Sequence, residues 1–391
     1  MSTRDSIREE LEAAAAHGLR RQIPPITRWE GPLVTVHGRP AVNFSANDYL
    51  GLADHPALRA TVASALAHER FGAGGARLIA GDLPAHGEVE GAVAAWLRCE
   101  AALLYNSGYQ ANLGTIGALV GPGDGLFSDA LNHASIIDGA RLSRATIQVY
   151  PHRDLATLAH HLAAAAGLRR RLIVTDSLFS MDGDVAPLAD LADLARRHDA
   201  LLLVDEAHAL GASGEEGRGF TAGLPIDLRL GTFGKALGGF GAFVAGDRLL
   251  IELLVQRARA FVFSTALPSP VSRWAAAALA LVRSPEGEAR RRHLAALTRR
   301  FRTGLRALDL PVAAEGTYII PLVVGAPEAT MALSRELLAR GIYAQGIRPP
   351  TVPPGTARLR FSLLASHLEA HVDAALEALR ALRQLLPMSR R

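Results

Sequence analysis

The sequence predicts an α/β protein with a mostly parallel sheet in a large domain and a smaller α+β domain at the C-terminal end. Short apolar runs typical of buried strands alternate with helical segments between residues 46 and 280. Strands that are apolar along their whole length are typical of a parallel sheet covered on both faces. Beyond residue 280 the pattern changes to longer helices with few strands. We therefore expect a helix and strand segment (1–45), a large domain (46–280) and a small domain (281–391).

The individual elements follow from local patterns in chain order. A helix is expected over 6–21, followed by a Pro-Pro break and a short strand, LVTV, at 33–36. The strands expected in the large domain are 102–105, 125–129, 146–150, 171–176 and 200–205. Between them, HGEVEGAVAAWL and PLADLADLARRH have helical periodicity. In the last segment, YIIPLVV and ARLRFSLL are expected to be strands.

Composition excludes several classes of protein. The 391 residues are 49% hydrophobic and 20% charged, which is typical of a globular protein with a sizeable core. Cys99 is the only cysteine, which excludes an internal disulfide and a multi-cysteine metal site. The first residues are charged and lack the apolar core of a signal peptide, and the longest apolar run, 274–282, is too short to span a bilayer. We expect a cytoplasmic protein without a membrane partner.

The basic residues do not predict a nucleic-acid partner. The net charge is +4, which is small for a chain of 391 residues. Arginines cluster at 169–171 and 289–306. These clusters lack the aromatic or glycine-rich neighbours that normally accompany a nucleic-acid surface. A solvated helix face is the simpler interpretation.

Lys235 is the only lysine among 42 lysines and arginines, and it lies in the glycine-rich stretch GTFGKALGGFGAF. An arginine can replace a lysine as a cation but not as a nucleophile, because the guanidinium stays protonated. A desolvated lysine can attack a carbonyl group and form an imine. A single surface lysine kept by chance is the alternative, and the rest of the sequence must decide between the two.

Polar residues follow several of the predicted strands. Ser107-Gly108-Tyr109 opens a helix whose free N–H groups could bind an anion, although Ser107 could also be an ordinary helix cap. His133 follows the next strand and could equally be a helix-capping histidine. Ser180, with Asp182 and Asp184, lies in a polar loop that turn chemistry alone could explain. In open α/β sheets, ligands bind outside the carboxyl ends of the strands, where these residues are expected.

A carboxylate and a second histidine follow the strand 200–205. Asp205 and His208 belong to LLLVDEAH, which also resembles the second nucleotide motif of helicase-type NTPases. That interpretation requires a G-x-x-x-x-G-K-[ST] phosphate loop. The only Gly-Lys pair is followed by Ala236 and has Arg229 where the first glycine should be. The NTPase interpretation is therefore rejected.

The candidates that remain are an anion site at a helix N-terminus, a strand-end carboxylate, two histidines and a single lysine. Together they are the groups that a pyridoxal 5'-phosphate (PLP) enzyme needs. The phosphate binds at a helix N-terminus, a lysine forms the imine, and a carboxylate keeps the pyridine nitrogen protonated. A carboxylate at ~4 Å contributes roughly 4 kcal/mol at an effective dielectric of ~20, which is about three pKa units. Asp205 suits this role.

These stretches resemble the α-oxoamine synthase family of fold type I PLP-dependent transferases, nearly end to end. The resemblance includes SGYQAN, NHASIIDG, FSMDGD, VDEAHALG and TFGKALG, in family order, between NFSANDYLGL and RLRFSLLASH. The loop at 346–360 is most similar to the members that join L-alanine to a pimeloyl thioester, carried by coenzyme A or by acyl carrier protein, in biotin biosynthesis. A relative with another amino acid or acyl donor, such as a glycine C-acetyltransferase, and a non-catalytic protein with the same fold stay open.

The resemblance also implies roles for single residues. Lys235 is implied to form the imine, Asp205 to contact the pyridine nitrogen, and His133 to stack on the cofactor and act in catalysis on the substrate. His208 is implied near the phenolic oxygen of the cofactor. The residues implied to hold the phosphate are Ser107, Gly108, Tyr109, Thr232 and Thr265. Those implied to contact the amino acid are Asn47, Ser180 and Arg360, and Ser180 is also implied to contact the cofactor.

The implied acyl site and assembly rest on fewer residues. Arg20 and Thr351 match family positions near the acyl substrate. Thr265 matches a contact supplied by the other subunit, so the resemblance implies a homodimer with shared sites; the alternative is that Thr265 caps the helix beginning near Pro268. The sequence departs from the family pattern at DLP, residues 82–84, where the family is expected to have other residues. No metal is expected.

Overall fold

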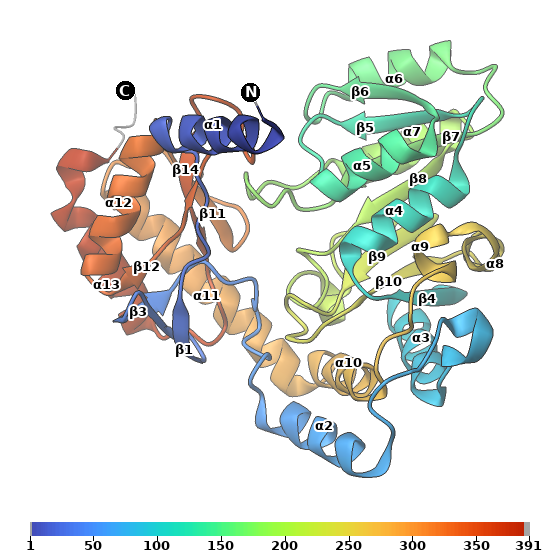
Figure 1. Ribbon diagram of the computed structural model, residues 1–391, viewed down its shortest axis with the longest axis horizontal. Coiled ribbons are helices and arrows are strands. Elements are labelled where there is room, and N and C mark those ends of the chain that lie inside the picture. The colour runs from blue at the N-terminus through green and yellow to red at the C-terminus, as the bar shows by residue number, and fades with distance from the viewer. Residues whose placement is uncertain (1, 387–391) are drawn as a thin grey trace. The chain divides into compact units, whose positions relative to one another are not determined.

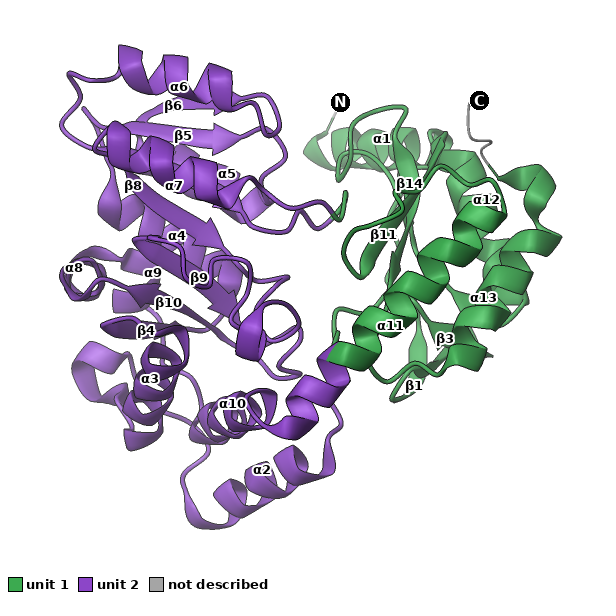
Figure 2. Cartoon of the chain, turned by 180° about the vertical axis from the view of Figure 1, so that it is seen from behind, with its two compact units in different colours: residues 1–49, 181–183, 292–391 green, residues 50–180, 184–291 purple. Residues whose placement is uncertain are grey.

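A computed structural model describes residues 2–386, and the chain forms two compact units (Figure 2). As far as they are described, the first unit contains 1–49, 181–183 and 292–391, and the second contains 50–180 and 184–291. We refer to them as unit 1 and unit 2. The three segments expected from the sequence, with boundaries at residues 45 and 280, stay a prediction.

Unit 2 is built on a seven-stranded sheet in the order β4-β10-β9-β8-β7-β5-β6 (Figure 1). The pairs β5/β6, β5/β7, β7/β8 and β8/β9 are parallel, whereas β10 is antiparallel to both β4 and β9. The predicted α/β class with a mostly parallel sheet is therefore confirmed. The strands are β4 (Ala101–Tyr105), β5 (Gly125–Asp129), β6 (Thr146–Tyr150), β7 (Arg171–Asp176), β8 (Leu201–Asp205), β9 (Leu228–Thr232) and β10 (Ala242–Gly246).

The two faces of this sheet contribute to two separate cores, because successive side chains of a strand point to opposite sides. Leu126 and Leu172 belong to the core that contains residues of α4, α5, α8 and α9. Their chain neighbours Phe127 and Ile173 belong to the core that contains residues of α6 and α7. This double burial explains why the strands are apolar along their whole length. Each fully buried leucine contributes roughly 2 kcal/mol to folding.

The helices of unit 2 connect and cover these strands. They are α2 (Pro56–His68), α3 (Pro84–Leu97), α4 (Gly108–Leu119), α5 (Ala134–Ser143), α6 (Leu155–Ala164), α7 (Leu188–Arg197), α8 (Arg248–Arg257), α9 (Arg259–Val262) and α10 (Ser269–Val282). Two short helical turns are η1 (Arg77–Gly81) and η2 (Glu215–Gly217). The boundary between the two units falls within α11 (Pro285–Ala307).

Unit 1 contains two small sheets, ordered β1-β2-β3-β12 and β11-β14-β13. The strands are β1 (Ile26–Glu30), β2 (Leu33–Val36), β3 (Arg39–Asn43), β11 (Ile319–Gly325), β12 (Ile342–Tyr343), β13 (Gly346–Ile347) and β14 (Ala357–Ser362). The helices are α1 (Thr3–Ala16), α12 (Pro327–Ala339), α13 (Glu369–Ala381) and the short η3 (Arg383–Leu385). Aromatic rings fill part of its interior: Phe44, Phe301 and Phe361 lie with ring centroids 5.2 to 6.0 Å apart.

The first helix begins three residues earlier and ends five residues earlier than expected. Helix α1 spans Thr3–Ala16 rather than 6–21, because Ser2 caps its N-terminus by accepting a hydrogen bond from the backbone N–H of Asp5. It ends before Gly18, whose φ of +65° is a conformation that glycine adopts at little cost.

Within residues 2–386, no helix is both long and apolar enough to cross a membrane. The same described residues contain no group of three or more histidine, cysteine, aspartate or glutamate side chains placed to hold a metal ion.

Candidate active site

The carboxyl ends of β7 and β8 carry two aspartates side by side. Asp176 and Asp205 are the last residues of these parallel strands and are register partners. Both carboxyl groups are buried, with 4% and 5% of the residues exposed. The sequence predicted Asp205 but not Asp176. The only signal for Asp176 is that an acidic residue ends an otherwise apolar strand, as in Asp205.

Asp205 is held in place by hydrogen bonds to both carboxylate oxygens. The side-chain amide of Asn112 donates to Oδ2 at 2.8 Å, and the backbone N–H of Ala207 donates to Oδ1 at 2.9 Å. Asn112 is fully buried in α4 and also donates to Ser135 Oγ at 2.9 Å. The sequence analysis missed Asn112, although it ends the motif SGYQAN that opens α4. Its amide fixes the direction in which the carboxylate points.

Asp176 holds the neighbouring histidine by its backbone. Asp176 Oδ2 accepts a hydrogen bond from the backbone N–H of His133 at 2.8 Å. Burial, together with the charge of Asp205, raises the pKa of Asp176 well above its usual value. The structure therefore favours one negative charge, rather than two, at the ends of β7 and β8, since two adjacent buried carboxylates repel each other.

His133 is the N-cap of α5, and burial favours the neutral form of its ring. Its Nδ1 lies 2.8 Å from Ser135 Oγ and accepts a hydrogen bond from the backbone N–H of Ser135 at 3.3 Å. Burial lowers the pKa of His133, although the charge of Asp205 raises it in part. The ring is thus a rigid, uncharged plane that Asp176 and Ser135 orient. It caps the helix and is also available for stacking, so the two interpretations of His133 are compatible.

The anion site predicted at Ser107 and Gly108 lies at the N-terminus of α4. Ser107 is its N-cap, with Oγ accepting from the backbone N–H of Gln110 at 3.3 Å, while the N–H groups of the first turn have no intrahelical partner. A Cβ on Gly108 would lie 2.8 Å from Thr232 Cγ2, so only glycine fits there without a shift. The hydroxyl of Thr232 is buried without a hydrogen-bond partner. A buried unpaired hydroxyl beside free N–H groups fits the phosphate of PLP, which is rich in acceptors.

Tyr109, the second residue of α4, has a side chain that is hydrogen-bonded to the neighbouring helix α5. Its side chain is exposed, and its hydroxyl is hydrogen-bonded to Asp138 on α5. That contact joins the start of α4 to α5. The predicted phosphate contact of Tyr109 would therefore come from its backbone N–H or from a ring that lies over the site.

Lys235 lies in the loop between β9 and β10, in a turn that glycines make possible. The backbone N–H of Gly238 donates to the carbonyl of Lys235 at 2.9 Å, and Gly238 has a φ of +65°. A Cβ on Gly238 would lie 2.4 Å from backbone atoms of Leu52 and Ala53, which excludes any larger residue. The lysine side chain is half-buried. The glycine-rich surroundings noticed in the sequence are thus a means of fixing the Lys235 backbone.

The other predicted residues of unit 2 also lie in loops. His208 is buried in the segment after β8, and Ser180 is half-buried in a loop that is closed by a β-bridge between Leu178 and Val185. Thr265 is exposed, and its carbonyl accepts a hydrogen bond from the side-chain amide of Asn106 at 2.8 Å. The cap of α10 is Pro268, without any side-chain hydrogen bond. The alternative that Thr265 caps this helix is therefore wrong.

In unit 1, the structure brings together the predicted pair Arg360 and Asn47. Both terminal nitrogens of Arg360, on β14, lie 3.1 Å from Asn47 Oδ1. Its guanidinium also donates to Ser362 Oγ at 3.0 Å and to the hydroxyl of Tyr49 at 3.1 Å. These three partners are neutral groups that orient the guanidinium. Tyr49 was missed because it contacts Arg360 only in the folded chain.

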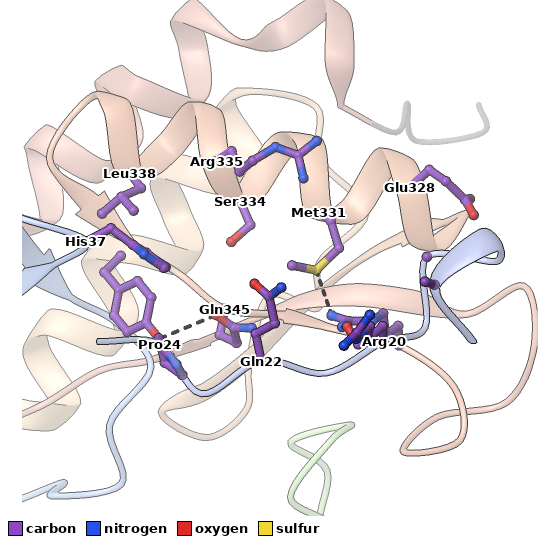
Figure 3. Close-up of a pocket in the computed structure, with 14 residues that line it drawn as sticks. Arg20, Gln22, Pro24, His37, Glu328, Met331, Ser334, Arg335, Leu338 and Gln345 are labelled. Carbon is purple, nitrogen blue, oxygen red and sulfur yellow. Dashed lines mark hydrogen bonds between the residues drawn. The ribbon is translucent and has the colours of Figure 1, made fainter. Parts of the chain in front are cut away.

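Arg20 and Thr351 also lie in unit 1, but they are not in direct contact. Arg20 lines a cavity of about 600 Å³ (Figure 3). Thr351 Oγ1 accepts a hydrogen bond from Arg21 at 3.1 Å. The structure thus ties Thr351 to the residue that follows Arg20 in the chain.

The divergent loop near residues 82–84 is explained by an ion pair in unit 2. Asp82 accepts a hydrogen bond from Arg77 Nε at 2.7 Å across the turn η1. The same guanidinium forms a second, bidentate pair with Glu90. Pro84 then begins α3. The unusual residues at 82–84 thus close a local turn.

The chain is similar to several known proteins over nearly its whole length. The family model "Aminotransferase class I and II" matches residues 39–379. The chain is 52% identical over 387 residues to an 8-amino-7-oxononanoate synthase of Anaeromyxobacter dehalogenans, covering 98% of this chain and 96% of that protein. A second relative with the same name, from Geobacter sulfurreducens, is 48% identical over 96% of this chain and 97% of its own length.

Solved structures give the same class of protein. A serine palmitoyltransferase of Sphingomonas wittichii has a TM-score of 0.91 with 32% identity, covering 99% of both chains. One from S. paucimobilis with a bound PLP–myriocin aldimine has a TM-score of 0.89 with 29% identity over 96% of both chains. An 8-amino-7-oxononanoate synthase from Francisella tularensis has a TM-score of 0.76 with 27% identity over 88% of this chain and 98% of its own.

Fold, site and comparisons together define a PLP-dependent enzyme of fold type I. Within that class, the chain belongs to the α-oxoamine synthase family. The resemblance noticed in the sequence motifs is confirmed, and so is the cofactor that it implied.

Proposed function

We propose that the chain catalyses the condensation of L-alanine with a pimeloyl thioester to give 8-amino-7-oxononanoate, carbon dioxide and the free thiol. The observation that carries this function is the identity of about 50% to several 8-amino-7-oxononanoate synthases over nearly the whole chain. The strand-end site supports it, because its residues suit an amino-acid substrate and PLP. The product belongs to biotin biosynthesis.

When bound, PLP supplies a carbonyl carbon for amines and an electron sink that stabilises a carbanion at the amino-acid Cα. Lys235 provides the amine that attaches the cofactor. When it is not attached to the cofactor, the amine of Lys235 would act as the base that removes the alanine α-proton. A positioned general base typically contributes ~10²–10⁴-fold to the rate.

Asp205 keeps a proton on the pyridine nitrogen throughout the reaction. Asn112 and the backbone N–H of Ala207 hold its two oxygens, so the carboxylate does not need to reorient in any step. The phosphate is held by Ser107, Gly108 and Thr232, where the structure leaves donors unpaired. His133, kept neutral by burial, provides a flat ring against the cofactor.

Arg360 binds the alanine carboxylate, and Asn47 orients Arg360. A guanidinium binds a carboxylate through two parallel hydrogen bonds, which fixes the amino acid as well as attracting it. The remaining predicted contacts are Ser180 and His208 beside the cofactor, and Arg20 with Thr351 beside the acyl donor. After the new carbon–carbon bond forms and the thiol leaves, the alanine carboxylate departs as carbon dioxide and Cα takes up a proton.

The active assembly in this proposal is a homodimer with shared sites. Thr265 is exposed, and its segment is fixed by the backbone bridge to Ala76 and by Asn106. A hydroxyl presented in this way suits the phosphate of a second subunit.

Product analysis tests the proposed function. The purified enzyme is incubated with L-alanine and pimeloyl-CoA, and the products are identified by mass spectrometry. We expect 8-amino-7-oxononanoate and one equivalent each of carbon dioxide and coenzyme A. Parallel reactions with L-serine and palmitoyl-CoA, or glycine and acetyl-CoA, test the other activities of the family. Turnover of one of these pairs in preference to the alanine pair would overturn the proposal.

A further inference from the structure

His152 lies between two carboxylates of unit 2, in the turn that follows β6. Its Nδ1 is 3.0 Å from Asp129 Oδ1, and its Nε2 is 2.8 Å from Asp184 Oδ2. The side chain is 24% exposed, and its ring packs edge-on against Phe179, with the ring centroids 4.4 Å apart. A carboxylate oxygen therefore faces each of the two ring nitrogens.

This arrangement favours a proton on both ring nitrogens. A neutral imidazole donates from one nitrogen and accepts at the other, whereas an ionised carboxylate only accepts. With a neutral ring, one of the two contacts would place a lone pair against a carboxylate oxygen. The two oxygens of Asp129 already act as acceptors, for the backbone N–H groups of Leu131 at 2.8 Å and Arg153 at 2.9 Å. The geometry is thus that of an imidazolium bound by two carboxylates.

The other titratable and charged groups around the ring agree with a charged His152. Burial lowers the pKa of His152, but the hydrogen bonds and charges of Asp184 and Asp129 outweigh burial and raise the pKa above its usual value. Tyr150, at the end of β6, stays neutral, because burial and the charge of Asp129 raise its pKa. Arg153 is an opposing cation, and its exposed Nη1 donates to Asp184 Oδ2 at 3.3 Å. The imidazolium and Arg153 together balance the two carboxylates.

The two carboxylates belong to segments that carry predicted site residues. Asp129 ends β5, which lies beside β6 in the sheet (Figure 1), and the chain continues from it to His133. Asp184 lies in the loop of Ser180, whose ends are joined by a β-bridge. His152 therefore connects the turn before His133 with the loop that contains Ser180.

We propose that His152, as an imidazolium, is a positioning residue of the active site that keeps the loop of Ser180 in place relative to His133. The proposal rests on the proposed function for the contact of Ser180 with the amino acid. A neutral ring keeps its N–H on Asp129, because water can replace the ring at the half-exposed Asp184 but not at a buried carboxylate. The bond to Asp184 is then lost, and the amino acid binds more weakly.

The sign of the pH dependence follows from the raised pKa. The stabilisation that the charged ring provides is complete below the unfolded pKa of ~6.5 and is lost as the pH rises through the folded pKa. Amino-acid binding should therefore weaken on the alkaline side of neutrality.

Nuclear magnetic resonance measures the charge of His152 directly. The ring signals of the PLP-loaded protein with isotope-labelled histidines are followed as the pH is raised, and the signal missing from His152→Gln is that of His152. We expect a pKa above ~6.5 in the wild type and a lower pKa in Asp184→Asn. The matched control is His160→Gln, an exposed residue of α6, which should leave the His152 signal unchanged. A wild-type pKa at or below ~6.5 would overturn the proposal.

Binding of L-alanine, followed by the absorbance of PLP, measures the positioning. In the wild type, the Kd should rise by about fivefold as the pH passes through the pKa of His152, because one hydrogen bond is lost. His152→Gln should bind weakly throughout and lack this step. Asp184→Asn should bind tightly throughout, because its amide donates to a neutral Nε2 while Nδ1–H donates to Asp129. Other groups that titrate, such as the alanine amine, act equally in all three proteins.

A pH step that survives unchanged in Asp184→Asn would contradict the proposal and leave His152 with a structural role only. This variant decides the question even if His152→Gln does not fold. Should product analysis identify another amino acid as the substrate, that amino acid replaces L-alanine in the titration. Failure of the proposed function and failure of this proposal are therefore separate results.

Discussion

Charged side chains gather at the strand ends of unit 2 and around the cavity of unit 1 that Arg20, Arg335 and Arg348 line. The two regions differ in how completely these side chains are hydrogen-bonded within the protein. At the strand ends, both oxygens of Asp205 are bonded, and Asp176 is tied to His133. The orientation of both carboxylates is thus fixed by hydrogen bonds within the protein. In the cavity, a buried hydrogen-bond donor, Nε of Arg348, is left without a partner among the described residues.

The largest effect is expected at the strand-end site, from Lys235→Arg. The variant keeps the positive charge but loses both the attaching amine and the general base. We expect turnover to fall by at least about 10⁴-fold. Steady-state product formation measures the loss, and circular dichroism checks that the fold is kept. A variant with a tenth of normal activity would mean that Lys235 is not the reacting amine.

Asp205→Asn separates charge from shape at the same site. The amide keeps the size of the side chain but no longer stabilises the protonated pyridine nitrogen, a loss of roughly 4 kcal/mol or about 10³-fold in rate. We expect PLP to remain bound, as seen by its absorbance, while turnover drops. Near-normal turnover would show that another group protonates the ring.

A buried histidine in unit 1 offers a test of stability rather than activity. His367 is buried, donates to the carbonyl of Asn43 at 3.0 Å and accepts from the backbone N–H of Leu364 at 3.1 Å. Burial lowers its pKa to about 4. Since its unfolded pKa is ~6.5, the stability from neutral His367 is complete above pH ~6.5 and is lost as the pH falls toward ~4.

His367→Gln should remove this pH dependence. Between pH 7.5 and pH 5, the wild type should lose about 2 kcal/mol more than the variant in free energy of unfolding. Denaturant titrations of both proteins at the two pH values measure the difference. An equal loss in both proteins would show that His367 is protonated in the folded state.

Asn112→Ala tests whether the orientation of the Asp205 carboxylate affects turnover as strongly as its charge does. The carboxylate loses one hydrogen bond but keeps its charge, so we expect about a tenfold decrease in turnover with PLP still bound. The reference is Asp205→Asn, which should be more severe. Equal losses in the two variants would imply that Asn112 has a role of its own beyond positioning.

Thr265→Ala is expected to have the smallest effect, weakening PLP binding by about fivefold to tenfold. The proposed sharing of sites is tested by mixing it with inactive Lys235→Ala subunits and allowing exchange. One site of each mixed dimer then contains Lys235 together with the partner's intact Thr265. We expect PLP affinity to recover at that site. No recovery after confirmed exchange would place Thr265 in the site of its own subunit.

The sequence alone predicted the parts that depend on local pattern. Strands 125–129, 146–150 and 171–176 are found with the predicted bounds, because buried parallel strands are apolar throughout. It did not predict β10, which lies between glycines, nor the capping that starts α1 at Thr3. For the site, motifs indicated Asp205, His133 and Lys235, whose residue types and positions suit the proposed chemistry.

The parts missed by sequence depend on distant contacts. Asn112 reaches Asp205 across 93 positions of the chain, and Arg348 reaches Arg20 across 328. Neither pair has a local pattern that distinguishes it from an ordinary helix or loop residue. The position of Arg20, Arg335 and Arg348 around one cavity is therefore known only from the folded chain.

The central claim is that one amine, Lys235, carries the chemistry of this enzyme. Borohydride reduction of the PLP-loaded protein, followed by proteolysis and mass spectrometry, tests it directly because the sequence offers no other ε-amine. We predict a single modified peptide that contains Lys235. A reduced cofactor on any other residue, or no covalent cofactor in a protein that turns over L-alanine, would contradict the account.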